Sequence, residues 1–265
     1  MNITLSQEDI SRLSEHVEAA QLDAKPIPKL TNEFSEMTVD DGYAIQLALK
    51  DRYLKRGERL VGWKAGLTSK AKMRQMGVDV PSIGFLTDGM SRPENSVIST
   101  SDLVHPRVEC EVAFVTKHDL QGPDCTAELV LEATDFVLPA IEIIDSRYEN
   151  FKFDLESVIA DNSSSSRFVG GGRPRRAQDL DLRTLGVVLE KNGEIVEMGA
   201  SAEVLGHPAE AVAMVVNLLH KLGESLPAGS FVMSGGITAA VKVSAGDHVI
   251  ARFQDLGSIS IRFGE

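Results

Sequence analysis

The chain has 265 residues, of which 43% are hydrophobic and 25% charged, and these values exclude a disordered or low-complexity protein. Its net charge of −12 argues against nucleic acid as the main partner, because phosphate binding needs a basic surface. The N-terminus has no basic segment followed by an apolar one, and the chain has no apolar run long enough to cross a membrane. Together with two cysteines outside any zinc-type spacing, these features predict a cytoplasmic protein that does not span a membrane.

The N-terminal part of the chain is predicted to be mostly helical. Ser6 with Asp9 resembles a capping arrangement that begins one helix, and Thr38 with Asp41 begins a second. The two prolines of "KPIPKL" interrupt the helical pattern between them. We therefore expect a smaller helical N-terminal region over residues 1–60.

Strands dominate the pattern from residue 61 to residue 265, which we expect to form a second, larger region. A short apolar strand holds Lys64 between Gly62 and Gly66, and the glycines indicate backbone packed closely around the lysine stem. The other expected elements are short helices near 69–76, 126–133 and 207–222, a hairpin over 184–198 with an Asn-Gly turn, and three or four short strands in the tail. This order predicts an α+β protein that is mainly β.

Two glutamates stand one residue apart in "HPRVECEVAFV", which otherwise has the pattern of a buried strand. Successive side chains in a strand point to opposite faces, so Glu109 and Glu111 share one face, at a separation of about 7 Å. That spacing suits two carboxylates that bind one hard divalent cation. It also suits the solvated face of an alternating strand.

A third glutamate, Glu142, lies in "VLPAIEIIDSR" with apolar residues on both sides, which predicts that it is buried. A buried carboxylate must be paired, protonated or bound to a metal, because leaving it isolated costs several kcal/mol. A structural ion pair with an arginine or lysine is one solution. Three carboxylates from two strands would instead form a set that leaves open positions on an octahedral ion. The second interpretation explains all three glutamates, and we favour it.

Several segments are similar to a known family in order and spacing. "GWKAGLTSKAKMRQMGVDVPSIGFL", "HPRVECEVAFV", "LPAIEIIDSR", "IADNSSSS" and "LGHPAEAV" resemble the hydratase/decarboxylase branch of the fumarylacetoacetate hydrolase superfamily, over nearly the whole chain. The resemblance implies that residues 61–265 form a catalytic domain with a rolled mixed sheet, preceded by the smaller helical region. It also implies a site in which Glu109, Glu111 and Glu142 bind Mg²⁺ or Mn²⁺, with Lys64 as the active-site lysine and Ser163 on the substrate side.

The resemblance implies an activity as well. We expect a lyase that decarboxylates a small 2-oxo dicarboxylic acid, (3E)-2-oxohex-3-enedioate, in the meta-cleavage degradation of aromatic compounds. A homo-oligomer and a complex with the hydratase of the same pathway are implied in the same way. Two alternatives stay open: a hydratase that adds water to 2-hydroxypenta-2,4-dienoate, and a non-catalytic module in which the acidic cluster is a structural Ca²⁺ site or a partner surface.

Two further segments are candidates for substrate contact. The segment from Leu67 to Ser82 is expected to act as a lid, and Ser82 stands where the hydratases typically carry an acidic residue. This difference favours the decarboxylase, although Asp79 lies close enough in sequence to keep the hydratase in view. The glycine turn at Ser234 and Gly235 offers backbone N–H groups to a substrate carboxylate, or is a tight turn between strands.

Overall fold

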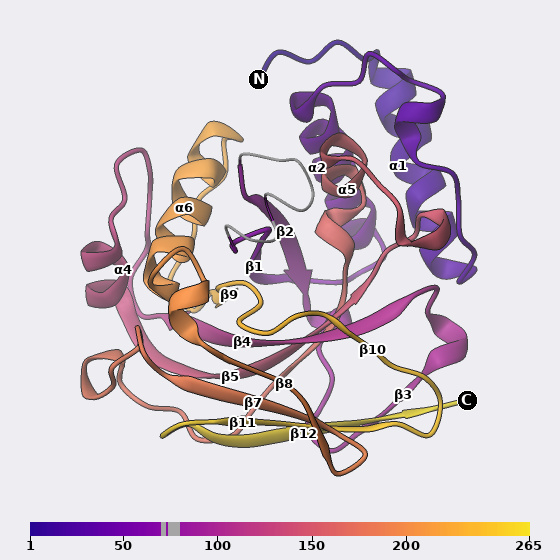
Figure 1. The fold of residues 1–265 in the computed structure, drawn as a ribbon. Helices are drawn as coiled ribbons and strands as arrows, with labels where there is room; N and C mark the ends of the chain where they lie inside the picture. The colour runs from indigo at the N-terminus through magenta and orange to yellow at the C-terminus, as the bar shows by residue number, and fades with distance from the viewer. Residues whose placement is uncertain (70–72, 74–79) are drawn as a thin grey trace.

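The computed structural model describes residues 1–69, 73 and 80–265. Two β-sheets are stacked, and most of the helices lie on the side of the larger sheet away from the smaller one (Figure 1). In the larger sheet the strand order is β2 (Ser82–Thr87), β1 (Leu60–Gly66), β9 (Phe231–Met233), β4 (Pro106–Thr116), β5 (Thr134–Asp145) and β6 (Ser165–Gly170), with β10 (Val241–Lys242) beside β4. The pairing of β1 with β9 is parallel and the other pairings are antiparallel, so the sheet is mixed.

The smaller sheet contains the predicted hairpin. Its strand order is β3 (Val97–Ser99), β12 (Gly257–Gly264), β11 (His248–Phe253), β7 (Gly186–Lys191) and β8 (Glu194–Ala200). Asn192 and Gly193 join β7 to β8 with φ angles of 56° and 88°, as a tight hairpin turn requires. The hairpin and the tail strands are therefore confirmed.

The helical N-terminal region contains α1 (Gln7–Leu22) and α2 (Val39–Lys55), with the expected N-caps at Ser6 and Thr38. Asp41 completes a capping box with Thr38, and its carboxylate also accepts hydrogen bonds from the backbone N–H groups of Thr4 and Leu5. Burial alone would raise the pKa of Asp41, but these hydrogen bonds outweigh it and hold that pKa well below its ordinary value. One side chain thus fixes the start of α2 and the segment that precedes α1.

This helical region is fastened to the rest of the chain through α2. Helix α2 packs against α5 (Leu155–Ala160), and the buried amide of Gln46 donates to the carbonyl oxygens of Ile83 and Ile159 at 2.8 and 2.9 Å. Each of these two bonds joins the N-terminal region to the region after residue 60. The proposed domain boundary at residue 60 stays a prediction.

The other α-helices in the described part of the chain, α4 (Ala127–Ala133) and α6 (Pro208–Lys221), pack against each other, and α6 also packs against β1. By length and composition alone the segment 201–221 could cross a membrane, yet half of it is buried inside the fold. Many α6 side chains belong to the hydrophobic core, which identifies a core helix of this fold. Helices α4 and α6 begin and end close to the predicted positions. Short 3₁₀ helices also occur at 30–32, 88–90, 100–102, 149–151, 162–164, 177–179 and 201–203.

Strand β2 was not among the expected elements, although all of its residues are buried. Its sequence "SIGFLT" is short and contains a glycine, so its pattern alone does not separate a strand from a loop. Pairing with β1 gives it a place in the sheet. The helix expected near 69–76 lies almost wholly outside the described residues.

We predict that Asp41→Ala lowers the free energy of unfolding by about 1–2 kcal/mol, because it removes the cap and the bonds to the N-terminal segment. Urea denaturation followed by circular dichroism measures this change. The pKa of Asp41 is lower in the folded state, so its contribution should be complete above pH 3.8 and fade as the pH falls further. The control is Glu8→Ala, a change at an exposed residue in the first turn of α1, which should alter the free energy of unfolding by less than about 0.5 kcal/mol. An equal loss of stability in both variants would contradict the role assigned to Asp41.

Candidate metal centre

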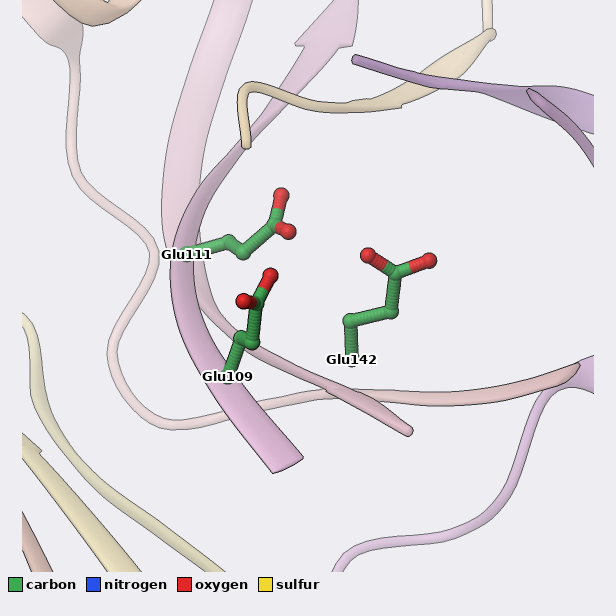
Figure 2. A group of neighbouring side chains, drawn as sticks. All are labelled: Glu109, Glu111 and Glu142. Carbon is green, nitrogen blue, oxygen red and sulfur yellow. The ribbon is translucent and has the colours of Figure 1, made fainter. Parts of the chain in front are cut away.

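Three glutamates from two neighbouring strands meet at one point. Glu109 and Glu111 project from β4, and the antiparallel register pairs Glu109 directly with Glu142 of β5. One carboxylate oxygen of each residue lies within 4.8 Å of the others. Figure 2 shows the three carboxylate groups close to one another, with Glu109 and Glu111 on the same strand. The structure therefore brings together the three residues that the sequence indicated.

The alternation of β4 explains why its two glutamates share a face. Val108, Cys110 and Val112 lie on the opposite face, and each is 0% exposed. Glu109 is 9% exposed and Glu111 0%, so the interpretation of a solvated polar face is wrong. The strand is buried on both faces, and its carboxylates occupy a site inside the protein.

The side chain of Lys64 on β1 supplies a positive charge to this cluster. Its Nζ atom lies 3.1 Å from Oε2 of Glu142, and the residue is only 3% exposed. Burial alone would lower the pKa of Lys64, but the charges of Glu142, Glu111 and Glu109 outweigh it and raise that pKa. The predicted ion pair of Glu142 is thus present. The carboxylates of Glu109 and Glu111 lie in the same small volume as this pair.

The excess negative charge is evident at Glu111. Burial, together with the nearby charge of Glu142, raises the pKa of Glu111 well above its ordinary value. Its Oε2 atom accepts a hydrogen bond of 2.6 Å from the N–H of Gly235. Among the described residues, Oε1 of Glu111 and Oε1 of Glu142 accept no hydrogen bond, and Oε2 of Glu142 is contacted by Nζ of Lys64. Hard divalent cations bind such oxygens, so the donor set fits a metal ion.

The cluster borders a pocket lined by both polar and apolar side chains, and we refer to these two groups of residues as its polar side and its apolar side. The polar side carries Lys64, Thr68, Glu109 and three serines, while the apolar side is formed by Ile144, Phe151, Phe153 and Val158. At Gly66, a Cβ atom would lie 2.7 Å from Oγ of Ser82 and 3.5 Å from Nζ of Lys64. Glycine at this position keeps the pocket open beside the lysine. The apolar side was not identified from the sequence, because no local pattern connects Ile144 to residues 151–158.

The serines of "NSSSS" differ in what they contact. Oγ of Ser163 donates to the carbonyl oxygen of Ile83 at 2.8 Å and lies 3.0 Å from Oγ of Ser82. Oγ of Ser164 is buried and has no hydrogen-bond partner in the described part of the chain, and this residue lines the same pocket. Sequence reasoning selected Ser163 and missed Ser164, since four consecutive serines give no signal that separates them.

Other candidates have different surroundings from those expected. Ser82 is the first residue of β2 and is 1% exposed, so it belongs to the sheet and not to a free loop. The N–H of Gly235 bonds to Glu111, and among Ser234, Gly235 and Gly236 it is Gly236 that lines the pocket. Leu67 also lines the pocket, with a φ of 56°. Asp79 and most of the expected lid lie outside the described residues, so the lid stays a prediction.

Comparison with known proteins gives concordant matches over nearly the whole chain. A sequence model of the fumarylacetoacetate (FAA) hydrolase C-terminal family matches residues 63–263. The 4-oxalocrotonate decarboxylase of Pseudomonas sp. (strain CF600) is 57% identical over 263 residues, which are 99% of this chain and 100% of that protein. The 2-hydroxyhexa-2,4-dienoate hydratase of Comamonas testosteroni is 39% identical over 244 residues, which are 91% of this chain and 92% of that protein.

A solved structure matches the fold directly. The 4-oxalocrotonate decarboxylase from Pseudomonas putida G7, complexed with magnesium and adipate, aligns with a TM-score of 0.97 and 54% identity. The alignment covers 99% of this chain and 100% of that chain. The fold class expected from the sequence, an α+β protein with a mixed rolled sheet, is therefore confirmed.

We predict that a divalent cation stabilises the folded protein, because it neutralises carboxylates that otherwise repel one another. Mn²⁺ at about 100 times its Kd should add about 2.7 kcal/mol, a rise in Tm of several degrees by scanning calorimetry. Without the cation, stability should fall as the pH rises above 4.5, because the pKa of Glu111 is higher in the folded than in the unfolded state.

Glu111→Gln separates charge repulsion from cation binding. In EDTA this variant should melt at the same temperature as the wild type or higher, because one of the repelling charges is gone. It should also lose most of the Mn²⁺-dependent rise in Tm. Equal melting temperatures of the wild type in EDTA and in Mn²⁺ would argue against a cation site.

Proposed function

The chain belongs to the fumarylacetoacetate hydrolase family, and on that premise we propose that it decarboxylates (3E)-2-oxohex-3-enedioate to 2-hydroxypenta-2,4-dienoate and CO₂. This activity is that of a carboxy-lyase in the meta-cleavage degradation of aromatic compounds. The observation that carries the proposal is the buried cluster of Glu109, Glu111 and Glu142 beside Lys64, in a pocket with one apolar side. High similarity over the full length to 4-oxalocrotonate decarboxylases supports the same activity.

Glu109, Glu111 and Glu142 would hold the metal, Mg²⁺ or Mn²⁺. Their oxygens are of the type that these hard cations prefer, and Oε1 of Glu111 and Oε1 of Glu142 are without donors among the described residues. When bound, the cation supplies Lewis-acid polarisation of the 2-oxo group and stabilises negative charge on its oxygen. The ammonium group of Lys64 adds a second positive charge at the same place.

The bond that breaks joins C5 to the distal carboxylate carbon, C6. Its electron pair passes through the C3–C4 double bond to the C2 oxygen as CO₂ leaves, and a proton on that oxygen completes the 2-hydroxydiene. Lys64 is the group we assign to deliver this proton, because it is buried beside the cluster and its raised pKa keeps it protonated. The residue acts as an acid and an electrostatic group, and no imine is needed.

The apolar side of the pocket is where we place the departing carboxylate. A carboxylate that faces Phe151, Phe153 and Val158 loses hydration, and its conversion to neutral CO₂ is then favoured. The hydroxyl group of Ser164, which has no partner among the described residues, is available to bind a substrate oxygen on the polar side. The two sides of the pocket thus suit the two ends of the dicarboxylate.

A hydratase is the alternative within the same family, favoured by the 39% identity to a dienoate hydratase. Such an enzyme needs an acid or base that handles water, and the residue at the corresponding place in this pocket is Ser82, whose hydroxyl contacts Ser163. The residue type at position 82 therefore supports the decarboxylase. A purely structural Ca²⁺ module would not need a lysine and a pocket beside its carboxylates.

We also propose that the protein works in the cytoplasm as a homo-oligomer and binds the hydratase that consumes its product. The product is an unstable dienol, so direct transfer to a second enzyme would limit its loss. Sedimentation of the protein alone and with that hydratase measures both associations.

The direct test is the product formed from (3E)-2-oxohex-3-enedioate in the presence of Mg²⁺. We expect CO₂ and 2-hydroxypenta-2,4-dienoate in equal amounts, measured by NMR and CO₂ capture. Excess EDTA should abolish turnover, and Glu142→Gln should lower kcat/KM by about 10²-fold or more while the fold survives. Full activity in EDTA, or no CO₂ from the wild type, would refute the proposed mechanism.

We predict that Ser82→Asp introduces water addition to 2-hydroxypenta-2,4-dienoate and slows CO₂ release by about tenfold. The new carboxylate would lie in the pocket that Lys64 lines, where it can orient a water molecule and repel the distal carboxylate. Ser82→Asn is the matched control, with similar size and no charge. If the Asp variant forms no 4-hydroxy-2-oxopentanoate and decarboxylates at the wild-type rate, position 82 does not discriminate between the two reactions.

A further inference from the structure

We propose that the buried ion pair of Arg147 and Asp161 is the positioning element for the substrate side of the pocket. It holds residues 162–164 in a left-handed turn, and that turn presents Ser163 and Ser164 to the substrate. The inference rests on the proposed function in one respect, namely that the pocket receives a dicarboxylate. Neither charged residue lines the pocket, so both act through the turn.

Arg147 contacts both ends of the turn. Its Nε atom donates to the carboxylate of Asp161, and its Nη2 atom donates to the carbonyl oxygen of the same residue. On the other side, Nη1 donates to the carbonyl oxygens of Ser165 at 3.1 Å and Asp145 at 2.6 Å. Both members of the pair are 0% exposed. A planar guanidinium with several donors is suited to fix two chain segments at once.

The turn between these ends has a conformation that its residues rarely adopt. Asn162, Ser163 and Ser164 have φ angles of 50°, 50° and 59°. Left-handed backbone at a non-glycine residue is uncommon, and three such residues in succession need support from the surrounding structure. Arg147 provides that support through its hydrogen bonds to Asp161 and Ser165, the residues on either side of the turn.

Further contacts tie the turn to the strand beside Lys64. The side-chain amide of Asn162 bonds to the N–H of Phe85 at 2.8 Å and to its carbonyl oxygen at 3.0 Å. A Cβ atom at Gly84 would lie 2.7 Å from the carbonyl oxygen of Asn162, so glycine permits this approach. Gly84 pairs with Lys64 across β1 and β2. A shift of the turn would therefore change where both serines lie relative to the lysine.

The positions of the three metal-binding glutamates do not depend on the ion pair of Arg147 and Asp161 as the positions of the serines do. Glu109, Glu111 and Glu142 are placed by the pairing of β4 with β5, and no hydrogen bond among the described residues links their side chains to the turn. Loss of the ion pair should therefore weaken substrate binding and leave cation binding intact. A merely structural role would reduce stability without this separation.

The experiment compares Asp161→Asn and Arg147→Lys with the matched control Glu18→Gln. Glu18 is also a buried carboxylate, paired with Arg52 and Arg56, but it lies on α1 away from the pocket. Titration calorimetry with Mn²⁺ and then with adipate, an unreactive dicarboxylate, measures the two affinities separately. Asp161→Asn and Arg147→Lys should each weaken adipate binding by about tenfold or more and raise KM by a similar factor. Their affinity for Mn²⁺ should stay within about twofold of that of the wild type. Glu18→Gln should change melting temperature only.

The outcomes distinguish the inference from the proposed function. Wild-type affinity for adipate in folded Asp161→Asn and Arg147→Lys, or a parallel loss of Mn²⁺ affinity, would overturn the inference. If Asp161→Asn does not fold, Arg147→Lys carries the test of the ion pair. Asn162→Ala, which removes the contacts to Phe85 and an asparagine suited to the φ of 50°, should show the same selective loss of adipate affinity because it disturbs the same turn. Absence of CO₂ from the wild type would refute the proposed function, whereas weaker adipate binding in the variants would still support the positioning role.

Discussion

The antiparallel pairing of β4 with β5 is the constraint on which the rest of the site depends. Its register places Glu109 opposite Glu142, and the alternation of β4 brings Glu111 to the same face. A slip of one residue would turn every carboxylate of one strand to the other side of the sheet. The fully buried Val108 and Val112 on the opposite face make such a slip costly, so the hydrophobic core holds the polar site in register.

This arrangement places three carboxylates and one lysine in a space that water hardly reaches. Burying a charge costs several kcal/mol, and the lysine offsets only part of that cost at Glu111 and Glu142. The raised pKa of Glu111 is a direct consequence of this imbalance. A divalent cation supplies the missing charge, and this is the physical reason that we assign a metal to the cluster. Stability and chemistry therefore depend on the same feature of the protein.

The substrate side of the pocket comes from other parts of the chain. Strands β1 and β2 contribute Lys64 and Ser82, the turn after α5 contributes Ser163 and Ser164, and the loop before α5 contributes the aromatic side chain of Phe151. Because Ser82, Ser163, Ser164 and Phe151 lie outside β4 and β5, substitutions at these residues can change the reaction while the carboxylates keep their places. The choice between losing CO₂ and adding water would then depend on a few side chains around a common centre.

The sequence by itself determined the features that depend on neighbouring residues. The N-caps at Ser6 and Thr38, the Asn-Gly hairpin and the shared face of the two β4 glutamates follow from local backbone geometry. Only the tertiary structure decided which distant groups meet. The contact of Lys64 with Glu142, the N–H bond of Gly235 to Glu111 and the apolar side of the pocket join residues far apart in the chain. Such partners are selected by burial and strand register over the whole fold, and no local pattern encodes them.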